Sequence, residues 1–250
     1  MKLSNESKTL FIPLLGKATM SKNNLFLKDY KAEEIISKIE YNLKQSKWLS
    51  MYMTLRALII DDLCNDYILK YPNITIIHLG CGLDSRNLRV NQNYKFWYDI
   101  DYKEVIDIRK KYYNDNEKYK MISSSVLKDT WLEEIKKEEN ILIIAEGLTM
   151  YLSEQEIKNL IYKINEKLDN VYLIFDAYSK KGVKLSKIKN PVNKMNAKIK
   201  YGIDNQNEFL LLNKNLKYLN TYPIKRDNNN LKGIEKFIFN NLYCGKLSQK

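Results

Sequence analysis

The sequence predicts an α/β fold with a mostly parallel, seven-stranded sheet, an antiparallel hairpin at one edge and a helical N-terminal region. Two observations predict it. Apolar runs alternate with amphipathic helical segments over residues 73–178, which is the pattern of a parallel sheet with helices on both faces. Helical periodicity covers residues 1–70, and two strand-like runs follow the alternating part. We therefore expect one domain over 1–250, with a helical lid and cap (1–70), a core (73–178), and an excursion leading to the last strands (179–250).

Two helices are expected before the core. In the segment 29–43, three isoleucines fall on one helical face. The segment 51–71 carries a broad apolar stripe, and the Tyr-Pro-Asn sequence at 71–73 ends it. Both segments should bury one face against the rest of the protein.

The core alternates between strands and helices. Residues Ser153 and Glu156 form a capping box that begins the longest of its helices. The last two strand-like runs are expected to pair as a hairpin at the sheet edge, and the segment 187–200 before them is a helical or loop excursion. The expected strands are 74–80, 94–101, 119–125, 140–147, 170–178, 217–224 and 235–247, and the expected helices are 104–113, 131–137 and 153–168.

Composition limits the classes of function. A hydrophobic fraction of 44% over 250 residues can build a large core, so global disorder is excluded. The net charge of +12 is compatible with nucleic-acid binding. However, only five of the basic residues are arginine, and the abundance of lysine, asparagine and isoleucine fits an AT-rich genome. RNA is therefore kept as a less favoured partner.

Cysteine content and hydropathy indicate the compartment. The three cysteines are odd in number and widely spaced, which argues against a disulfide framework or a zinc site and fits a reducing cytoplasm. No apolar stretch approaches the ~20 residues that span a bilayer. The N-terminal segment has no small-residue cleavage site and is expected to be part of the mature protein, not a signal peptide.

A glycine-rich turn follows the first expected strand of the core. Gly80 and Gly82 lie where that strand ends, and Asp101 lies 19 positions after Gly82 at the end of the second strand. In a doubly wound sheet, ligands bind at the carboxyl ends of the strands, and an acid about 20 residues after the glycines holds ribose hydroxyls. The two features together predict a cofactor that contains adenosine.

The residues beside the glycines discriminate between cofactors. A P-loop is excluded, because Phe11 and Ala18 stand at the key positions of the one candidate sequence. A dinucleotide is disfavoured, because Asp84 would repel a diphosphate and Ser85 replaces the third glycine. S-adenosylmethionine has no phosphate and carries a sulfonium cation, so a nearby carboxylate is tolerable. The turn therefore favours S-adenosylmethionine.

Six stretches carry a resemblance to a known family. The chain resembles the leucine carboxyl methyltransferases, in particular the bacterial branch similar to the tetracenomycin polyketide-synthesis O-methyltransferase. The resemblance implies a class I, Rossmann-like S-adenosylmethionine methyltransferase, with its substrate side after residue 178. One departure is Lys103, where the family usually has proline. The matching stretches, in family order, are LFIPLLGKATMSK, LRALIIDDL, IIHLGCGLDSRNLRV, WYDIDYKEVIDIRKKYY, MISSSVLKDTWL and IIAEGLTMYLSEQEIKNL.

The resemblance implies a set of cofactor contacts. Gly80 and Gly82 would lie against the methionyl part, and Asp101 would accept hydrogen bonds from the ribose diol. Glu146 resembles the family's cofactor-facing acid. Arg56 resembles the arginine that pairs with the methionine carboxylate, although an arginine on an apolar helix can also extend to solvent.

The adenine and lid positions follow from the same resemblance. Val126 occupies the position at the adenine edge, with Ser125 and Leu127 beside it. Other members carry an acid there, so an adenine amino contact would come from Ser125 or the backbone. Lys17 falls in the N-terminal segment that folds over the site in relatives.

Two further residues have structural readings. Asp99 is expected to be a strand-end acid without a ligand, a reading that Glu146 also allows. His78 lies among apolar residues of a strand, so a buried core imidazole is a better interpretation than a catalyst. No metal ligand and no catalytic residue is assigned.

The lack of a candidate general base limits the chemical class of the methyl acceptor. His78 is the only histidine, so a nucleophile that ionises unaided, a carboxylate or an acidic hydroxyl, fits best. The resemblance implies a small, polyketide-like metabolite. A protein C-terminus, a modified RNA base and a non-catalytic homologue that only binds the cofactor are the alternatives. Eight lysines between Lys180 and Lys200 are either a solvated face or an attraction for an anionic acceptor.

The segment 10–22 is expected to act as a lid. Pro13 and Gly16 should interrupt any helix there, while its apolar residues favour burial. Such a segment can close over a bound cofactor and exclude water. We expect it to order when the ligand binds.

Overall fold

The computed structural model describes residues 4–39, 45–136, 138–187, 196–224 and 241–247. Its centre is a seven-stranded sheet in the order β3-β2-β1-β4-β5-β7-β6. The first five strands run parallel, and β7 pairs antiparallel with both β5 and β6. The strands are β1 (Thr75–Leu79), β2 (Phe96–Asp101), β3 (Tyr119–Ser123), β4 (Ile141–Ala145), β5 (Val171–Ala177), β6 (Leu216–Pro223) and β7 (Asn241–Leu247).

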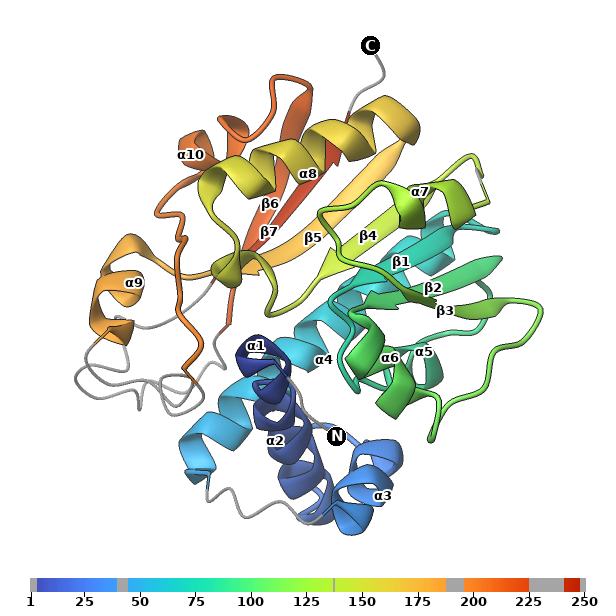
Figure 1. The fold of residues 1–250 in the computed structure, drawn as a ribbon, viewed down its shortest axis with the longest axis vertical. Helices are drawn as coiled ribbons and strands as arrows, with labels where there is room; N and C mark the ends of the chain where they lie inside the picture. The colour runs from blue at the N-terminus through green and yellow to red at the C-terminus, as the bar shows by residue number, and fades with distance from the viewer. Residues whose placement is uncertain (1–3, 40–44, 137, 188–195, 225–240, 248–250) are drawn as a thin grey trace.

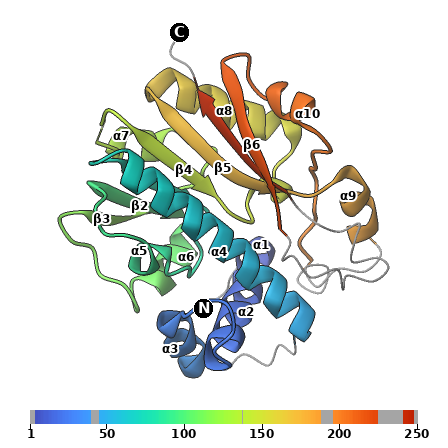
Figure 2. The same ribbon diagram turned by 180° about the vertical axis from the view of Figure 1, so that it is seen from behind.

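Helices cover both faces of this sheet. Figure 1 shows α7 (Thr130–Glu134) and α8 (Glu154–Lys167) across one face. Figure 2 shows α4 (Lys47–Lys70) crossing the other face, next to α5 (Arg86–Arg89) and α6 (Lys103–Arg109). The expected fold class is confirmed, including the antiparallel pair at one edge.

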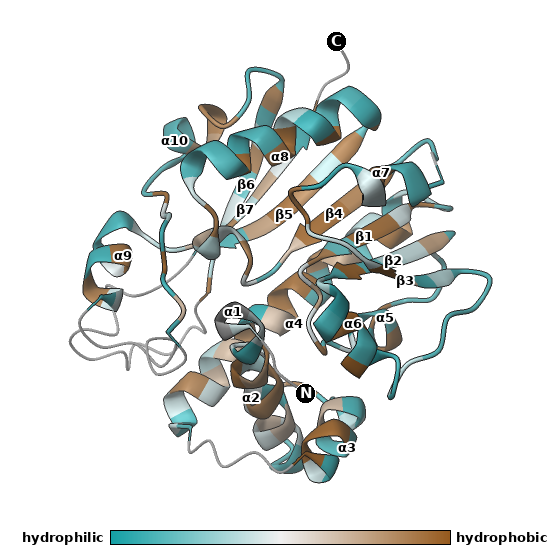
Figure 3. Ribbon diagram, viewed as in Figure 1, coloured by the Kyte–Doolittle hydropathy of each residue, from teal (hydrophilic) through white to brown (hydrophobic). Residues whose placement is uncertain are grey.

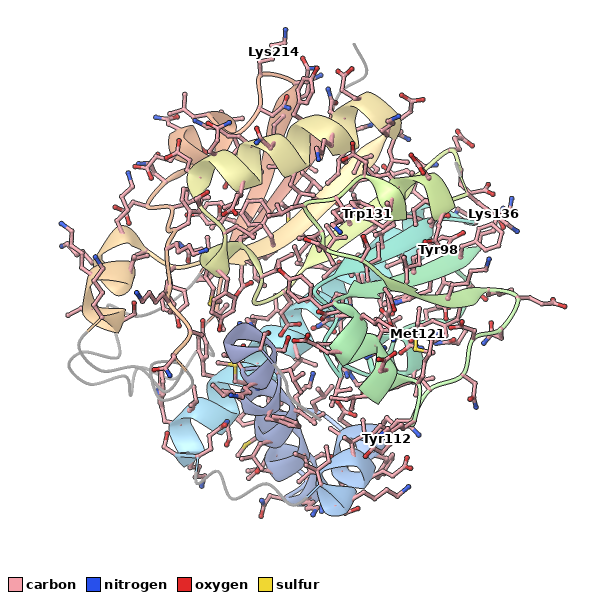
Figure 4. All side chains as sticks on the ribbon, in the orientation of Figure 1. Tyr98, Tyr112, Met121, Trp131, Lys136 and Lys214 are labelled. Carbon is pink, nitrogen blue, oxygen red and sulfur yellow. The ribbon has the colours of Figure 1, made fainter. Side chains whose placement is uncertain are left out.

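Alternation along the strands divides the core into two layers. In β1, Ile76 belongs to the layer under α4, whereas Ile77 belongs to the layer under α7 and α8. Figure 4 shows Tyr98 and Trp131 in this second layer, where both side chains are buried. Figure 3 shows the central strands as mainly hydrophobic and the outer side of α8 as hydrophilic. The sheet is therefore a rigid base on which the strand ends can hold a site.

Three N-terminal helices pack at the carboxyl ends of the strands. They are α1 (Asn5–Lys8), α2 (Phe11–Lys22) and α3 (Tyr30–Lys38). The apolar side chains of Leu10, Phe11 and Leu14 join the core layer formed with α4. These helices close the end of the sheet at which ligands bind in this fold.

The expectation that Pro13 and Gly16 interrupt the segment 10–22 is wrong. Helix α2 is continuous through both residues. Pro13 is the third helical residue, within the first turn, where no intrahelical bond to its nitrogen is needed. Gly16 allows close packing, because a Cβ atom there would lie 3.0 Å from the Cβ of Met53 and 3.2 Å from the carbonyl oxygen of Ser50 in α4. Tertiary contact therefore outweighs the low helix propensity.

The C-terminal part is more regular than the sequence indicated. Short helices α9 (Lys180–Ser186) and α10 (Gln206–Leu210) follow β5, and most of the expected excursion at 187–200 lies outside the described residues. The capping box of α8 is confirmed, since Ser153 Oγ accepts from the Glu156 amide and Glu156 Oε2 accepts from the Ser153 amide. Within the described ranges, no helix is long and apolar enough to span a membrane.

Candidate active site

A cavity of about 810 Å³ lies between the carboxyl ends of the strands and the N-terminal helices. It is lined by residues from the loops after β1, β2, β3, β4 and β5, together with α2 and the first half of α4. Ser125 is outside the lining, and its neighbour Ser124 lines the cavity instead. The sequence-predicted residues that line it are Lys17, Arg56, Gly80, Gly82, Asp101, Val126, Leu127 and Glu146.

The loop after β1 uses its two glycines for conformation and for close approach. Gly80 and Gly82 have φ values of +65° and +54°, in the left-handed region that side chains disfavour. A Cβ atom on Gly80 would lie 3.2 Å from the side chain of Leu148, in the loop after β4. The Gly80 amide donates to the carbonyl of Ile100 at 2.8 Å, which ties the loop to β2. Gly80 and Gly82 therefore present only backbone atoms to the cavity.

Asp101 is held at the end of β2 by backbone donors. One carboxylate oxygen accepts from the Gly82 amide at 2.8 Å, and the other accepts from the Tyr102 amide at 2.7 Å. Burial raises the pKa of Asp101 to about 6, against the lowering effect of these two hydrogen bonds. Each oxygen keeps a second lone pair, so the carboxylate can still accept from a vicinal diol.

Arg56 forms ion pairs with two acids, one directly after β4 and one near the end of β5. Its Nε donates to Glu146 and its Nη1 donates to Asp176, each at 2.9 Å, and all three side chains are buried. Arg56 therefore does not extend to solvent. Gly147, at φ +66°, gives the guanidinium its space, because a Cβ atom there would lie 3.3 Å from Nη2.

Arg86 is a second buried arginine that pairs with two acids. Its Nε donates to Asp61 at 2.6 Å and its Nη2 donates to Glu146. Burial alone would raise the pKa of Glu146, but the guanidinium groups of Arg56 and Arg86 hold it below its usual range. Glu146 is therefore an ionised acid in the cavity wall and not a strand end without contacts.

Asp84 connects this group to the N-terminal helices. Lys17 of α2 donates to Asp84 at 2.6 Å, and Arg89 donates to it at 2.9 Å. Burial alone would raise the pKa of Asp84, but Arg89, Lys17 and Arg86 hold it well below its usual range. We call the whole ion-paired group the buried network; its cations are Lys17, Arg56, Arg86 and Arg89, and its acids are Asp29, Asp61, Asp84, Glu146 and Asp176.

Arginine usage is the signal that sequence reasoning missed. Arg86, Arg89 and Arg109 were not singled out, yet each donates to a buried carboxylate, as Arg56 does. The fifth arginine of this lysine-rich chain, Arg226, lies outside the described residues. A planar guanidinium can bridge two carboxylates in a fixed geometry, whereas an ammonium cannot. In such a chain, scarce arginines mark buried ion pairs.

His78 and Asp99 have structural roles. The His78 ring is buried beside the cavity, with Nε2 3.4 Å from Arg86 Nη1 and Nδ1 3.6 Å from Asp99. Asp99 accepts from Arg109, Tyr119 and the Trp97 indole, so its charge is compensated away from the cavity. Asp99 accordingly does not line the cavity. Both side chains are buried, as expected, and His78 also lines the cavity.

The remaining part of the cavity has a different chemistry. Trp48 and Tyr52 of α4 stack there with ring centroids 5.6 Å apart and planes 11° from parallel. Within the described ranges, its charged residues are Lys200 and Glu156, and α9 contributes small and apolar residues to its rim. We call this part the apolar half; its other large side chains are Ile12, Leu49, Met53, Met150, Tyr151, Tyr178 and Leu185.

Nothing in the described ranges points to a metal. No group of three or more histidine, cysteine, aspartate or glutamate side chains there could hold a metal ion. The three cysteines are unpaired and buried. The part of the lysine run at 188–195 lies outside the described residues, and its interpretation stays open.

Comparison with known proteins gives a consistent family and fold. The family model for leucine carboxyl methyltransferases matches residues 10–165. The chain is 28% identical to the tetracenomycin polyketide synthesis O-methyltransferase of Streptomyces glaucescens, over 82% of this chain and 78% of the relative. It is also 28% identical to an S-adenosyl-L-methionine-dependent methyltransferase of Gibberella zeae, over 65% of this chain and 61% of the relative.

Solved structures share the fold at low sequence identity. A putative methyltransferase from Thermobifida fusca superposes with a TM-score of 0.61 at 11% identity, covering 93% of this chain and 94% of the other. The magnesium protoporphyrin IX methyltransferase of Synechocystis, solved with S-adenosylhomocysteine, gives 0.55 at 10% identity, covering 86% and 94%. The arrangement of helices and strands is therefore a fold that solved methyltransferases share.

Proposed function

The chain belongs to the leucine carboxyl methyltransferase family and is an S-adenosylmethionine-dependent methyltransferase, and we propose that it methylates the oxygen of a carboxylate or acidic hydroxyl on a small molecule. The observation that carries this proposal is that the described residues lining the cavity include no suitably placed general base. His78, the only histidine, is held between Arg86 and Asp99. An acceptor oxygen that arrives ionised needs no base, and its transfer then depends on alignment.

The acids of the cavity support the same conclusion. Asp84 and Glu146 have lowered pKa values because cations surround them, so both are weak proton acceptors. Glu156 is occupied in the capping box of α8. Asp101 is fixed by two backbone amides, and we assign it to the ribose. None of the four is arranged to take a proton from an alcohol or an amine.

The size and lining of the cavity favour a small-molecule acceptor. Small-molecule sites commonly have volumes of roughly 300–1,000 Å³ and mainly apolar walls. The cavity of about 810 Å³ lies in the upper part of that range, which suits a cofactor together with a compact acceptor. The apolar half would hold the acceptor, with Lys200 as the nearby positive charge. The similarity to an O-methyltransferase of polyketide synthesis supports this choice.

The remaining wall fits the cofactor. S-adenosylmethionine supplies an electrophilic methyl group when it is bound. We assign Asp101 to the ribose hydroxyls, with the backbone of Gly80 and Gly82 beside the methionyl part. Lys17 and Arg56 would offer positive charge to the methionine carboxylate.

The other cofactor assignments follow the cavity lining. Asp84 and Glu146 would offer negative charge to the methionine ammonium. Val126 and Leu127 would contact the adenine edge, and Ser124, which lines the cavity, would supply the polar contact that the sequence assigned to Ser125.

The chemical class of the product tests the proposal. The purified protein is incubated with methyl-labelled S-adenosylmethionine and a panel of aromatic and aliphatic carboxylic acids, phenols, amines, peptides and RNA. We expect label in a carboxylic acid or an acidic phenol. A methyl ester releases methanol in mild base, whereas an ether or an N-methyl product does not. Transfer only to amines, to peptides or to RNA would contradict the proposal.

A further inference from the structure

We propose that Arg109 is a positioning residue for the cofactor, because it fixes the conformation of Gly82 and thereby the direction in which Asp101 presents its carboxylate. Arg109 lies in the last turn of α6 and outside the cavity lining, so it acts on a bound cofactor through the residues that do line the cavity. Gly82 and Asp101 are both among those residues. The inference rests on the proposed assignment of Asp101 to the ribose and is independent of the acceptor.

The guanidinium of Arg109 is held in one orientation. Its Nη1 donates to the carbonyl of Gly82 at 3.1 Å, and its Nε donates to the hydroxyl of Tyr119 at 3.0 Å. Its Nη2 donates to Asp99. The side chain is fully buried, and its Cζ atom lies over the ring of Tyr113, 4.1 Å from the centroid. A planar group that is engaged at three nitrogens and against an aromatic ring can direct a bond precisely.

Gly82 connects Arg109 to Asp101. Its carbonyl accepts from Arg109, and its amide donates to Asp101 at 2.8 Å. Glycine adopts positive and negative φ about equally well, so these partners, and not the residue type, hold Gly82 at φ +54°. The Tyr113 hydroxyl donates to the carbonyl of Leu83 at 3.1 Å and anchors the next residue of the loop. Loss of Arg109 should therefore release Gly82, and with it one of the two amides that orient the carboxylate of Asp101.

The charges around Asp101 support the same connection. Asp101 interacts with Arg109 from α6, with Asp99 from its own strand and with the Cys81 thiol from the loop after β1. Burial raises the pKa of Asp101 to about 6, whereas the two backbone amides and the charge of Arg109 lower it and the charge of Asp99 raises it. Burial also raises the pKa of the Cys81 thiol, so this thiol stays neutral where Asp101 titrates. A neutral residue in place of Arg109 should therefore raise the pKa of Asp101 further.

Three changes separate the direction of the bond from the charge. Arg109→Lys keeps a positive charge beside Asp99 but loses the planar group that makes three directed bonds. Arg109→Gln removes the charge as well. Arg109→Gln combined with Asp99→Asn removes both charges of the buried pair, so neither is left unpaired. Lys110→Gln is the matched control, because Lys110 is exposed and follows Arg109 at the end of α6.

Isothermal titration calorimetry between pH 5 and pH 8 tests the inference with S-adenosylhomocysteine and its analogue that lacks the ribose 2′-hydroxyl. In wild type and the control, loss of the hydroxyl should weaken binding about tenfold, as expected for a hydrogen bond to a charged group. In the three Arg109 variants this ratio should fall to about threefold or less, because Asp101 no longer points at the hydroxyl. In Arg109→Gln the affinity for S-adenosylhomocysteine should also begin to fall at a higher pH than in wild type, whereas Arg109→Lys should keep the wild-type pH.

The ratio of the two affinities reports the direction of Asp101, which a general loss of stability does not change. A wild-type ratio in the Arg109 variants, or equal weakening of both ligands, would overturn the inference. Arg109→Lys protects the test against misfolding, since it leaves Asp99 beside a cation. Asp101→Asn is measured as the reference, and a wild-type ratio in that variant would refute the ribose assignment and the inference together. The proposed methylation of an oxygen is judged separately, from the product.

Discussion

Lys17 of α2 donates to Asp84 of the loop after β1 at 2.6 Å, and both side chains are buried. This contact is the direct ionic link between the N-terminal helices and the glycine turn. It makes the segment 10–22 a wall of the cavity and couples its position to the cofactor loop. Lys17 also faces the cavity, so one ammonium serves both the packing and the site.

Lys17→Met should weaken the binding of S-adenosylhomocysteine by tenfold or more and should loosen α2. The reason is that a buried cation is lost beside Asp84, which keeps only its arginine partners. Lys22→Met is the control, since Lys22 ends the same helix and is exposed. Hydrogen exchange over 10–22 with and without ligand checks the result. Equal protection of wild type and Lys17→Met in both states would contradict it, and equal protection of wild type with and without ligand would also contradict the lid.

The affinity for the cofactor should depend on the ionisation of Asp101. Because burial raises the pKa of Asp101 to about 6, the carboxylate is ionised above that pH and gains a proton below it. Binding of S-adenosylhomocysteine should weaken as the pH falls from 7 to 5. Asp101→Asn should bind roughly tenfold to a hundredfold more weakly at pH 8, and with less change over this range. Titrations at several pH values measure both effects, and a wild-type affinity that rises below pH 6 would contradict them.

The raised pKa of Asp101 also predicts how the stability of the ligand-free protein changes with pH. The folded protein holds a proton on Asp101 more tightly than the unfolded chain does, because its pKa rises from 3.8 to about 6. Between these values, raising the pH therefore removes stability. Asp101→Asn should have a higher thermal midpoint than wild type at pH 8, and the difference should shrink toward pH 4. A lower midpoint for the variant at pH 8 would show that the backbone amides compensate the charge fully.

Gly147→Ala should destabilise the protein more than Gly82→Ala. Both positions have positive φ, which costs a non-glycine residue roughly 1–2 kcal/mol. Only at Gly147 would the added Cβ crowd a guanidinium, at 3.3 Å from Arg56, whereas at Gly82 its nearest contact is Leu10 at an ordinary 3.5 Å. Denaturant unfolding without ligand measures the difference. Equal losses would mean that Arg56 shifts without cost.

Trp48→Ala should raise the KM for the acceptor about tenfold and leave the affinity for S-adenosylhomocysteine unchanged. Trp48 stacks on Tyr52 in the apolar half. Steady-state kinetics with the acceptor found in the panel, together with calorimetry, separates the two effects. Weakened cofactor binding in this variant would mean that Trp48 also contacts the cofactor.

The fold was readable from the sequence because its signals are local. The apolar run of β1, the strand-like segment of β2, the glycines after β1 and the Ser153–Glu156 capping box depend on neighbouring residues, and all appear where they were expected. The α2 helix was not readable in the same way. Its continuity through Gly16 depends on contact with Met53 in α4, and no local pattern contains that contact.

The candidate site was readable only in part. The sequence by itself determined the fold, the cofactor class and eight of the residues around the cavity, because a parallel sheet brings its strand ends to one edge. Only the tertiary structure decided that Arg56, Arg86 and Arg89 join acids from distant segments into one buried network. Ion pairs across 60 to 120 positions have no periodicity in a chain. They exist because burial requires each charge to find a partner, and the folded backbone alone decides which partner is near.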